Sequence, residues 1–216
     1  LGARIMSRRG LELEGEYRYL ARSYKGQAAV TLLPHDQVTG DLRYHAALTH
    51  DQQLTPRLSS HIAYEAVSDD TYFSDLSSQI TRTSLVNLPR DLAFNYNGGW
   101  WSALGRMQGF QTLQDPVAPN LALEPYQRLP QILLNANRPD LPHGLKFEMS
   151  GEFVRFEHSD TTKAEGDRFH LYPSLSLPLE TNYGFLTPKI GWHYTQYELD
   201  RNPVAPQTLS KNRSLP

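Results

Sequence analysis

The sequence has no cysteine among its 216 residues, which excludes disulfide bonds, thiol catalysis and zinc sites built on thiolates. It also has no apolar run of 18 residues, so no transmembrane helix is predicted. Neither sign of charge dominates, since 21 Lys and Arg stand against 23 Asp and Glu, and no electrostatic footprint for nucleic acid results. No signal-peptide pattern opens the chain, and we expect it to be a segment of a longer protein.

The lack of a long apolar run still permits a membrane protein built from strands. A membrane-spanning strand needs only about 9–11 residues, and only every second side chain must be apolar. Tyrosine is abundant, with 12 Tyr against 8 Phe, and such amphipathic rings suit the interfacial girdles of a barrel. Composition alone leaves a soluble β-sandwich equally compatible with the sequence.

Apolar and polar side chains alternate with a period of two in several segments, which predicts strands rather than helices. The apolar members of the first such row are Leu11, Leu13, Tyr17 and Tyr19. Further rows lie within residues 42–48, 58–66, 92–96, 145–153 and 169–179. Several rows are longer than the ~5–6 residues usual in sandwich strands. The pattern therefore favours an all-β antiparallel meander of about eight to twelve strands, forming a fragment of a large outer-membrane transmembrane β-barrel.

The opposite face of the first row is charged, and its members are Glu12, Glu14, Glu16 and Arg18. A charged side chain facing lipid is unfavourable, by about 2–4 kcal/mol for Arg or Lys at the bilayer midplane. We therefore predict that the charged row faces a hydrated lumen and that the apolar row faces lipid.

Turn-forming residues separate these rows. Hairpin connections are predicted at residues 34–41 and 51–53, and longer loops at residues 114–125, 139–144 and 159–167. Pro173 and Pro178 fall inside a strand pattern, where proline cannot donate to the ladder. They indicate either an edge strand or bulge, or a local weakness in the sheet. No linker divides the chain, so residues 1–216 are predicted to belong to one domain.

Few residue clusters suggest chemistry. His35-Asp36 and His50-Asp51 are sequence neighbours, which point to opposite faces of a strand and are poorly placed to act together. Residues 68–75 lack the spacing, glycine and final Glu of a calcium-binding EF-hand, and a capped turn explains them better. The Trp100-Trp101 pair suits an interfacial anchor. We predict no catalytic residue, no cofactor and no metal site.

Several motifs follow one another along the chain in an order that resembles a known family. Residues 8–10 (RRG), 16–20 (EYRYL) and 33–36 (LPHD) come first. A cluster with Ser68, Asp69, Tyr72, Phe73 and Asp75 is the most specific of them. It is followed by Phe110-Gln111 and then by Tyr126, Arg128, Leu129 and Pro130. The series ends with 153–156, Arg168, 172–173, 177–179 and 195–197. Together these motifs resemble the barrel domain of the LPS-assembly protein LptD (OstA/Imp) family over essentially all 216 residues.

The resemblance implies lipopolysaccharide transport and insertion into the outer leaflet of the outer membrane of a Gram-negative bacterium. It implies three partners besides outer-membrane lipid: lipopolysaccharide, an LptE-like lipoprotein plug in the lumen, and an LptA-like periplasmic bridge. The bridge would attach through an N-terminal jelly-roll that is absent here, as are the closing strands. We therefore expect an open sheet. A general porin-type channel, an outer-membrane enzyme and a soluble β-sandwich binding module remain as alternatives.

Overall fold

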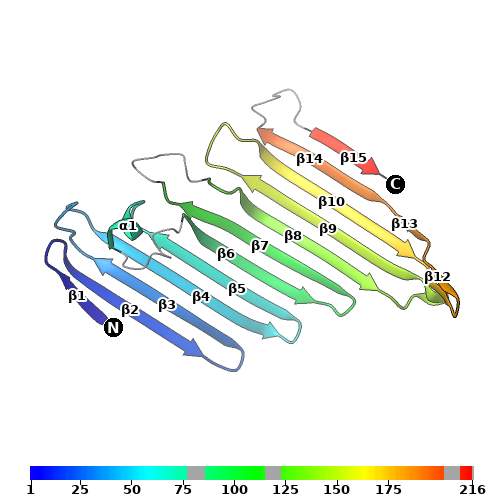
Figure 1. Ribbon diagram of the computed structural model, residues 1–216, viewed down its shortest axis with the longest axis horizontal. Coiled ribbons are helices and arrows are strands. Elements are labelled where there is room, and N and C mark those ends of the chain that lie inside the picture. The colour runs from blue at the N-terminus through cyan, green and yellow to red at the C-terminus, as the bar shows by residue number, and fades with distance from the viewer. Residues whose placement is uncertain (77–85, 115–122, 202–209, 216) are drawn as a thin grey trace. The chain divides into compact units, whose positions relative to one another are not determined.

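A computed structural model describes residues 1–76, 86–114, 123–201 and 210–215. Figure 1 shows antiparallel strands that follow one another in chain order. The chain forms two compact units, which share β6 (Asn87–Asn97) and β7 (Trp101–Thr112). Unit 1 comprises residues 1–54, 59–92 and 108–125, and unit 2 comprises residues 55–58, 93–107 and 126–216. No helix in the described ranges has the length and apolarity needed to cross a membrane.

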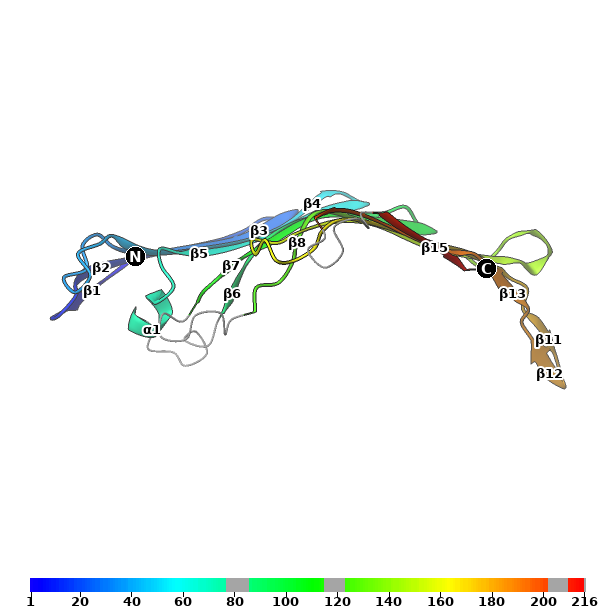
Figure 2. The same ribbon diagram turned by 90° about the horizontal axis from the view of Figure 1, so that it is seen from above.

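Unit 1 is a sheet that carries one short helix. Its further strands are β1 (Gly2–Met6), β2 (Gly10–Leu20), β3 (Tyr24–Leu33), β4 (Arg43–Thr55) and β5 (Leu58–Val67). The hydrogen-bonded order is β1-β2-β3-β4-β5-β6-β7. Helix α1 (Tyr72–Leu76) follows β5 and lies to one side of these strands (Figure 2).

Unit 2 continues in the same manner, with the order β6-β7-β8-β9-β10-β14-β15 and β13 also paired with β10. Its longer strands are β8 (Gln127–Arg138), β9 (Lys146–Glu157), β10 (Glu165–Ser176) and β14 (His193–Arg201). Its shorter elements are a 3-10 turn (Pro142–Gly144), β13 (Lys189–Gly191) and β15 (Ser210–Leu215). A separate hairpin is formed by β11 (Leu179–Thr181) and β12 (Gly184–Leu186).

The antiparallel meander predicted from the sequence is confirmed. In the described residues the order has β1 at one end and β15 at the other, and the sheet is not closed, as expected. The meander has twelve strands among the described residues, at the upper limit of the predicted number. Three further segments of three residues each, β11, β12 and β13, lie in the connection after β10.

Two local predictions are wrong. Residues 51–53 are not a hairpin connection, because β4 continues to Thr55 and the turn lies at residues 56–57. Pro173 lies neither on an edge strand nor at a bulge, because β10 pairs with β9 on one side and with β13 and β14 on the other. Its carbonyl accepts a hydrogen bond from Trp192 N at 3.0 Å, and its missing N–H removes one donor from the ladder. Pro178 lies in the connection between β10 and β11.

The two faces of the unit 1 sheet differ in chemistry. Directly opposed residues share a face, and one such set is Glu14, Thr31 and His45. The next set along the strands is Leu13, Leu32 and Tyr44, on the other face. Helix α1 covers the polar face, since the ring of His45 lies 6.0 Å from that of Tyr72 and 5.5 Å from that of Phe73.

Unit 2 shows the same division over the middle of its strands. Ile132, Phe153 and Phe169 are directly opposed on β8, β9 and β10, and they form part of an apolar face. Glu152, His170 and Thr195 are opposed on the other face. There Glu152 accepts a hydrogen bond from Gln131 at 2.6 Å and forms an ion pair with Arg168.

We predict opposite probe accessibilities at adjacent positions of β2. A spin label replacing Tyr17, which is 66% exposed, should respond mainly to a lipid-soluble quencher in bilayers. A label replacing Glu16 should respond mainly to a water-soluble quencher, because a carboxylate is stable only on a hydrated face. Electron paramagnetic resonance on the full-length protein measures both. Equal responses at the two positions would refute the assignment of the faces.

Candidate functional site: a buried arginine beneath an inward-folded segment

Arg43, the first residue of β4, is buried to 2% exposure and is surrounded by carboxylates. Its Nε and one terminal nitrogen donate to both oxygens of Asp69 at 2.9 and 2.7 Å, which is a bidentate ion pair. Its other terminal nitrogen donates to Asp75 at 2.8 Å and to Asp36 at 3.3 Å. The hydroxyl of Thr71 accepts a further bond at 3.2 Å.

Asp36 is fully buried and has a second cation. Arg9 donates to its Oδ2 at 2.6 Å, and the backbone N–H of Val38 donates to its Oδ1 at 3.0 Å. Arg9 also lies 3.4 Å from the carboxylate of Asp75. Burial raises the pKa of Asp36, but these hydrogen bonds outweigh burial and hold the pKa below its ordinary value.

The ionic cluster therefore consists of Arg9, Arg43, Asp36, Asp69 and Asp75, with two cations and three anions. Its members come from the β1–β2 turn, the β3–β4 loop, the start of β4, the segment after β5, and α1. Connections at one end of the unit 1 strands are thus tied together by charge. Arg43 and Asp36 are the buried members of the cluster, and a buried charge is unfavourable without its partner, so this pair favours one arrangement of the connections.

The apolar side chains of helix α1 are buried in a hydrophobic cluster. Tyr72, Phe73 and Leu76 pack with Leu33, Val67, Leu88 and Leu113 in one hydrophobic cluster. Burial raises the pKa of Tyr72 to about 12, with the negative charge of Glu12 adding to the effect. At five residues the helix is too short to be stable by itself. The ionic cluster and this hydrophobic cluster together hold the segment 68–76 against the polar face of the sheet.

The family-signature residues fall into two groups in the structure. Ser68, Asp69, Tyr72, Phe73 and Asp75 come together in the segment just described, and the Ser68 hydroxyl donates to Asp69 at 2.6 Å. Asp69 also accepts from the backbone of Thr71, which matches the capped turn expected there. Tyr126, Arg128, Leu129 and Pro130 lie in unit 2, at the start of β8.

The second group shapes the beginning of β8. The ring of Tyr126 lies 5.9 Å from that of Phe156 and 4.9 Å from that of His158. The β8–β9 register shifts between Arg128 and Gln131, and the Leu129-Pro130 peptide bond within the shifted stretch is cis. This group therefore marks an irregular strand start rather than a binding site.

The predicted lumen-facing residues occupy different environments. Glu12 is 2% exposed and accepts a hydrogen bond from Arg4 at 3.4 Å. Glu14 shares a face with His45 across β3, on the side that α1 covers. Glu16 is exposed and forms an ion pair with Arg18. That all four face an aqueous lumen stays a prediction.

Sequence reasoning missed Arg43 as the centre of the site. In the alternating row 42–48, Arg43 has the spacing of an ordinary polar strand residue, two positions before His45. A signal was available, since the segment 68–76 carries three aspartates, and carboxylates such as Asp69 and Asp75 need a counter-charge once they pack against a sheet. The partner could not be chosen among 21 cations without the register of the strands.

The attachment of segment 68–76 should depend on pH. The pKa values of Asp36 and Asp69 are both lowered in the folded state, because hydrogen bonds from Arg43 and other donors outweigh the effect of burial. A carboxyl group whose pKa is lower in the folded state than in the unfolded state stabilises the fold. This stabilisation is fully present above the pKa of the unfolded state, near 3.9, and is lost as the pH falls through the pKa of the folded state. The protection factors of residues 68–76, which correct hydrogen exchange for the pH dependence of the intrinsic rate, should stay high from pH 7 to about pH 4 and fall at lower pH. Loss of protection above pH 5 would contradict this.

An open antiparallel meander of long strands whose side chains alternate between an apolar and a polar face is the pattern expected of a fragment of an outer-membrane β-barrel. The model of the family "LptD: LPS transport system D" matches residues 41–216, and the chain belongs to this family. An outer-membrane location in a Gram-negative bacterium follows from that membership. It is a transport and assembly family rather than an enzyme family, and it disfavours the porin alternative.

Curated relatives are similar over nearly the whole chain. The "LPS-assembly protein LptD" of Aromatoleum aromaticum is 49% identical over 99% of this chain, which corresponds to 26% of the relative. The protein of the same name from an Azoarcus species is 48% identical, with the same two coverages. That from Nitrosospira multiformis is 38% identical over 91% of this chain and 21% of its own length. The chain thus spans about a quarter of the length of the relatives it matches.

Proposed function

We propose that this chain forms part of the wall of a translocon that transports lipopolysaccharide and inserts it into the outer leaflet of the outer membrane. The observation that carries the proposal is the two-faced sheet of a chain that belongs to the LptD family. Relatives named LPS-assembly protein support it. The reaction is movement of an amphiphile between compartments, so the chain needs no catalytic residue and no cofactor.

The chemistry of the two faces suits such a substrate. The saccharide part of lipopolysaccharide is polar and requires a hydrated path, which the face with Glu152, Arg168 and Gln131 can line. The acyl chains require apolar surroundings, since apolar groups are driven out of water by about 25 cal/mol per Å². A wall that is apolar outside and polar inside separates the two environments across one strand thickness.

Three partners follow from the proposed function. Lipopolysaccharide is the substrate, an LptE-like lipoprotein would occupy the lumen beside the polar face, and an LptA-like bridge would deliver the substrate from the periplasm. The segment 68–76 supports the presence of a filled lumen, because it is folded onto the polar face instead of extending away from the sheet.

Site-specific photo-cross-linking in cells tests the proposal. A photoreactive amino acid replaces Thr195 of β14 or Glu152 of β9, both on the polar face, in the full-length protein. Phe169, on the apolar face of β10, is the control. We expect adducts with lipopolysaccharide or a lumenal lipoprotein at Glu152 and only lipid adducts at Phe169. Depletion of the protein should also stop the appearance of new lipopolysaccharide at the cell surface.

Two results would refute the proposal. Normal surface lipopolysaccharide after depletion would exclude a role in transport. Conductance typical of an open channel, together with no adduct at Glu152, would favour the porin alternative instead.

A further inference from the structure

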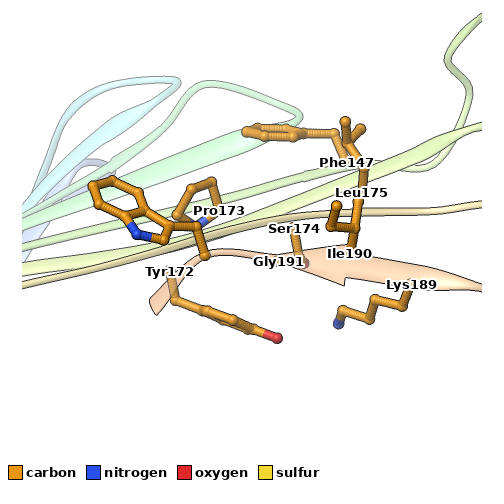
Figure 3. Close-up of a pocket in the computed structure, with 9 residues that line it drawn as sticks. Phe147, Tyr172, Pro173, Ser174, Leu175, Lys189, Ile190 and Gly191 are labelled. Atoms are coloured by element: carbon orange, nitrogen blue, oxygen red, sulfur yellow. The ribbon is translucent and has the colours of Figure 1, made fainter. Parts of the chain in front are cut away.

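A groove lies on unit 2 where β9, β10 and β13 run side by side (Figure 3). Its volume is about 800 Å³, within the range of about 300–1,000 Å³ that is usual for ligand sites. Phe147, Leu175 and Ile190 are directly opposed on the three strands, so all three side chains project from one face. Pro173 and Trp192 complete the apolar lining.

The groove belongs to the apolar face of the sheet. Phe147 and Leu175 have the same alternation as Phe153 and Phe169 farther along β9 and β10. Tyr172 and Lys189 also line the groove, and their side chains lie on the other side of the strands (Figure 3). There Lys189 donates to Glu148 at 2.8 Å, so this cation is already paired within the polar face.

Aromatic rings border the groove. The Trp192 ring stacks on Tyr194 with centroids 5.5 Å apart, and such rings gather where acyl chains meet head groups. The groove lies at the end of the strands where β6 and β7 are joined by only three residues, 98–100. Short connections are typical of the periplasmic end of a barrel.

We propose that this groove binds an acyl chain of a glycerophospholipid from the periplasmic leaflet. The occupant is a lipid because the groove is continuous with the apolar face and the chain is located in the outer membrane. It is a phospholipid because the groove lies at the end with short connections, away from the leaflet that holds lipopolysaccharide. Trp192, Phe147, Leu175 and Ile190 supply apolar surface for the acyl chain.

Native mass spectrometry of the full-length protein in mild detergent tests this proposal. The parent protein should retain one diacyl phospholipid. Trp192→Ala should reduce its occupancy about tenfold, because a large aromatic wall is lost. Leu175→Trp should also reduce it by filling the groove, while Trp192→Phe should retain most of it. Phe169→Ala is the matched control, since it truncates an aromatic ring of the same apolar face outside the groove.

Trp192→Ala removes a side chain that lines the groove, and Leu175→Trp fills the groove. A loss of bound lipid in both variants would therefore have two different structural causes. Unchanged occupancy in both would overturn the proposal. An equal loss in Phe169→Ala would show a general lipid layer rather than a site. Retention of lipopolysaccharide in place of phospholipid would show that the groove faces the other leaflet.

Discussion

Replacing Arg43 with Met should release the segment 68–76 from the sheet. The change leaves Asp36, which is fully buried, with Arg9 alone, and it removes the bidentate partner of Asp69. Removing one partner of a buried ion pair typically destabilises by about 3–5 kcal/mol, because the remaining charge stays desolvated. The equilibrium for opening the segment should therefore rise by about a hundredfold or more. Hydrogen exchange of residues 68–76 in the full-length protein measures it.

Two further variants separate burial from charge. Arg18→Met removes an exposed guanidinium, 72% accessible and paired with Glu16, and should change exchange little, since exposed pairs contribute about 0–1 kcal/mol. Arg43→Lys keeps the charge but loses the planar fork, so an intermediate effect is expected. If Arg43→Met behaved like Arg18→Met, the ionic cluster would not hold the segment.

The sequence predicts the sheet well because alternation is a local property. The row from Leu11 to Tyr19 shows which side chains share a face of β2, whatever strand lies beside it. The structure places the polar members of that strand on the face covered by α1. The end of β4 was missed because Asp51-Gln52-Gln53 has the composition of a turn. In the structure Asp51 accepts a hydrogen bond from His61 of β5 at 2.7 Å, so a polar pair continues the strands there.

The ionic cluster could not be predicted in the same way, because its members are joined by tertiary contacts. Arg43 and Asp69 are 26 residues apart, and Arg9 and Asp36 are 27 residues apart. The motif around Ser68 and Asp75 indicated a structural role for this segment, but a motif does not specify which face of the sheet it meets. The five-residue helix α1 also carries no periodic signal, since a 3.6-residue repeat needs several turns to be recognised.

Truncating Phe73 to Ala should loosen the same segment through its apolar side. Phe73 is 3% exposed, and its ring meets Tyr72 edge-on at 5.5 Å and His45 at the same distance. Loss of a buried Phe side chain typically costs about 3–5 kcal/mol, from lost burial and from the cavity that remains. The charges of Asp69 and Asp75 stay in place in this variant, so any release reports the hydrophobic contribution alone. Cleavage of residues 68–76 by a broad-specificity protease should accelerate at least about a hundredfold.

The control for Phe73→Ala is the same substitution at an exposed position. Phe185 in β12 is 84% exposed, so Phe185→Ala should leave cleavage of residues 68–76 unchanged. The double variant with Arg43→Met adds a test of independence. Both substitutions open the same segment. Once one substitution has opened it, the second can add little, so the effect of the double variant on cleavage should be smaller than the sum of the two single effects. Strict additivity would mean that the ionic cluster and the hydrophobic cluster stabilise the segment independently of each other.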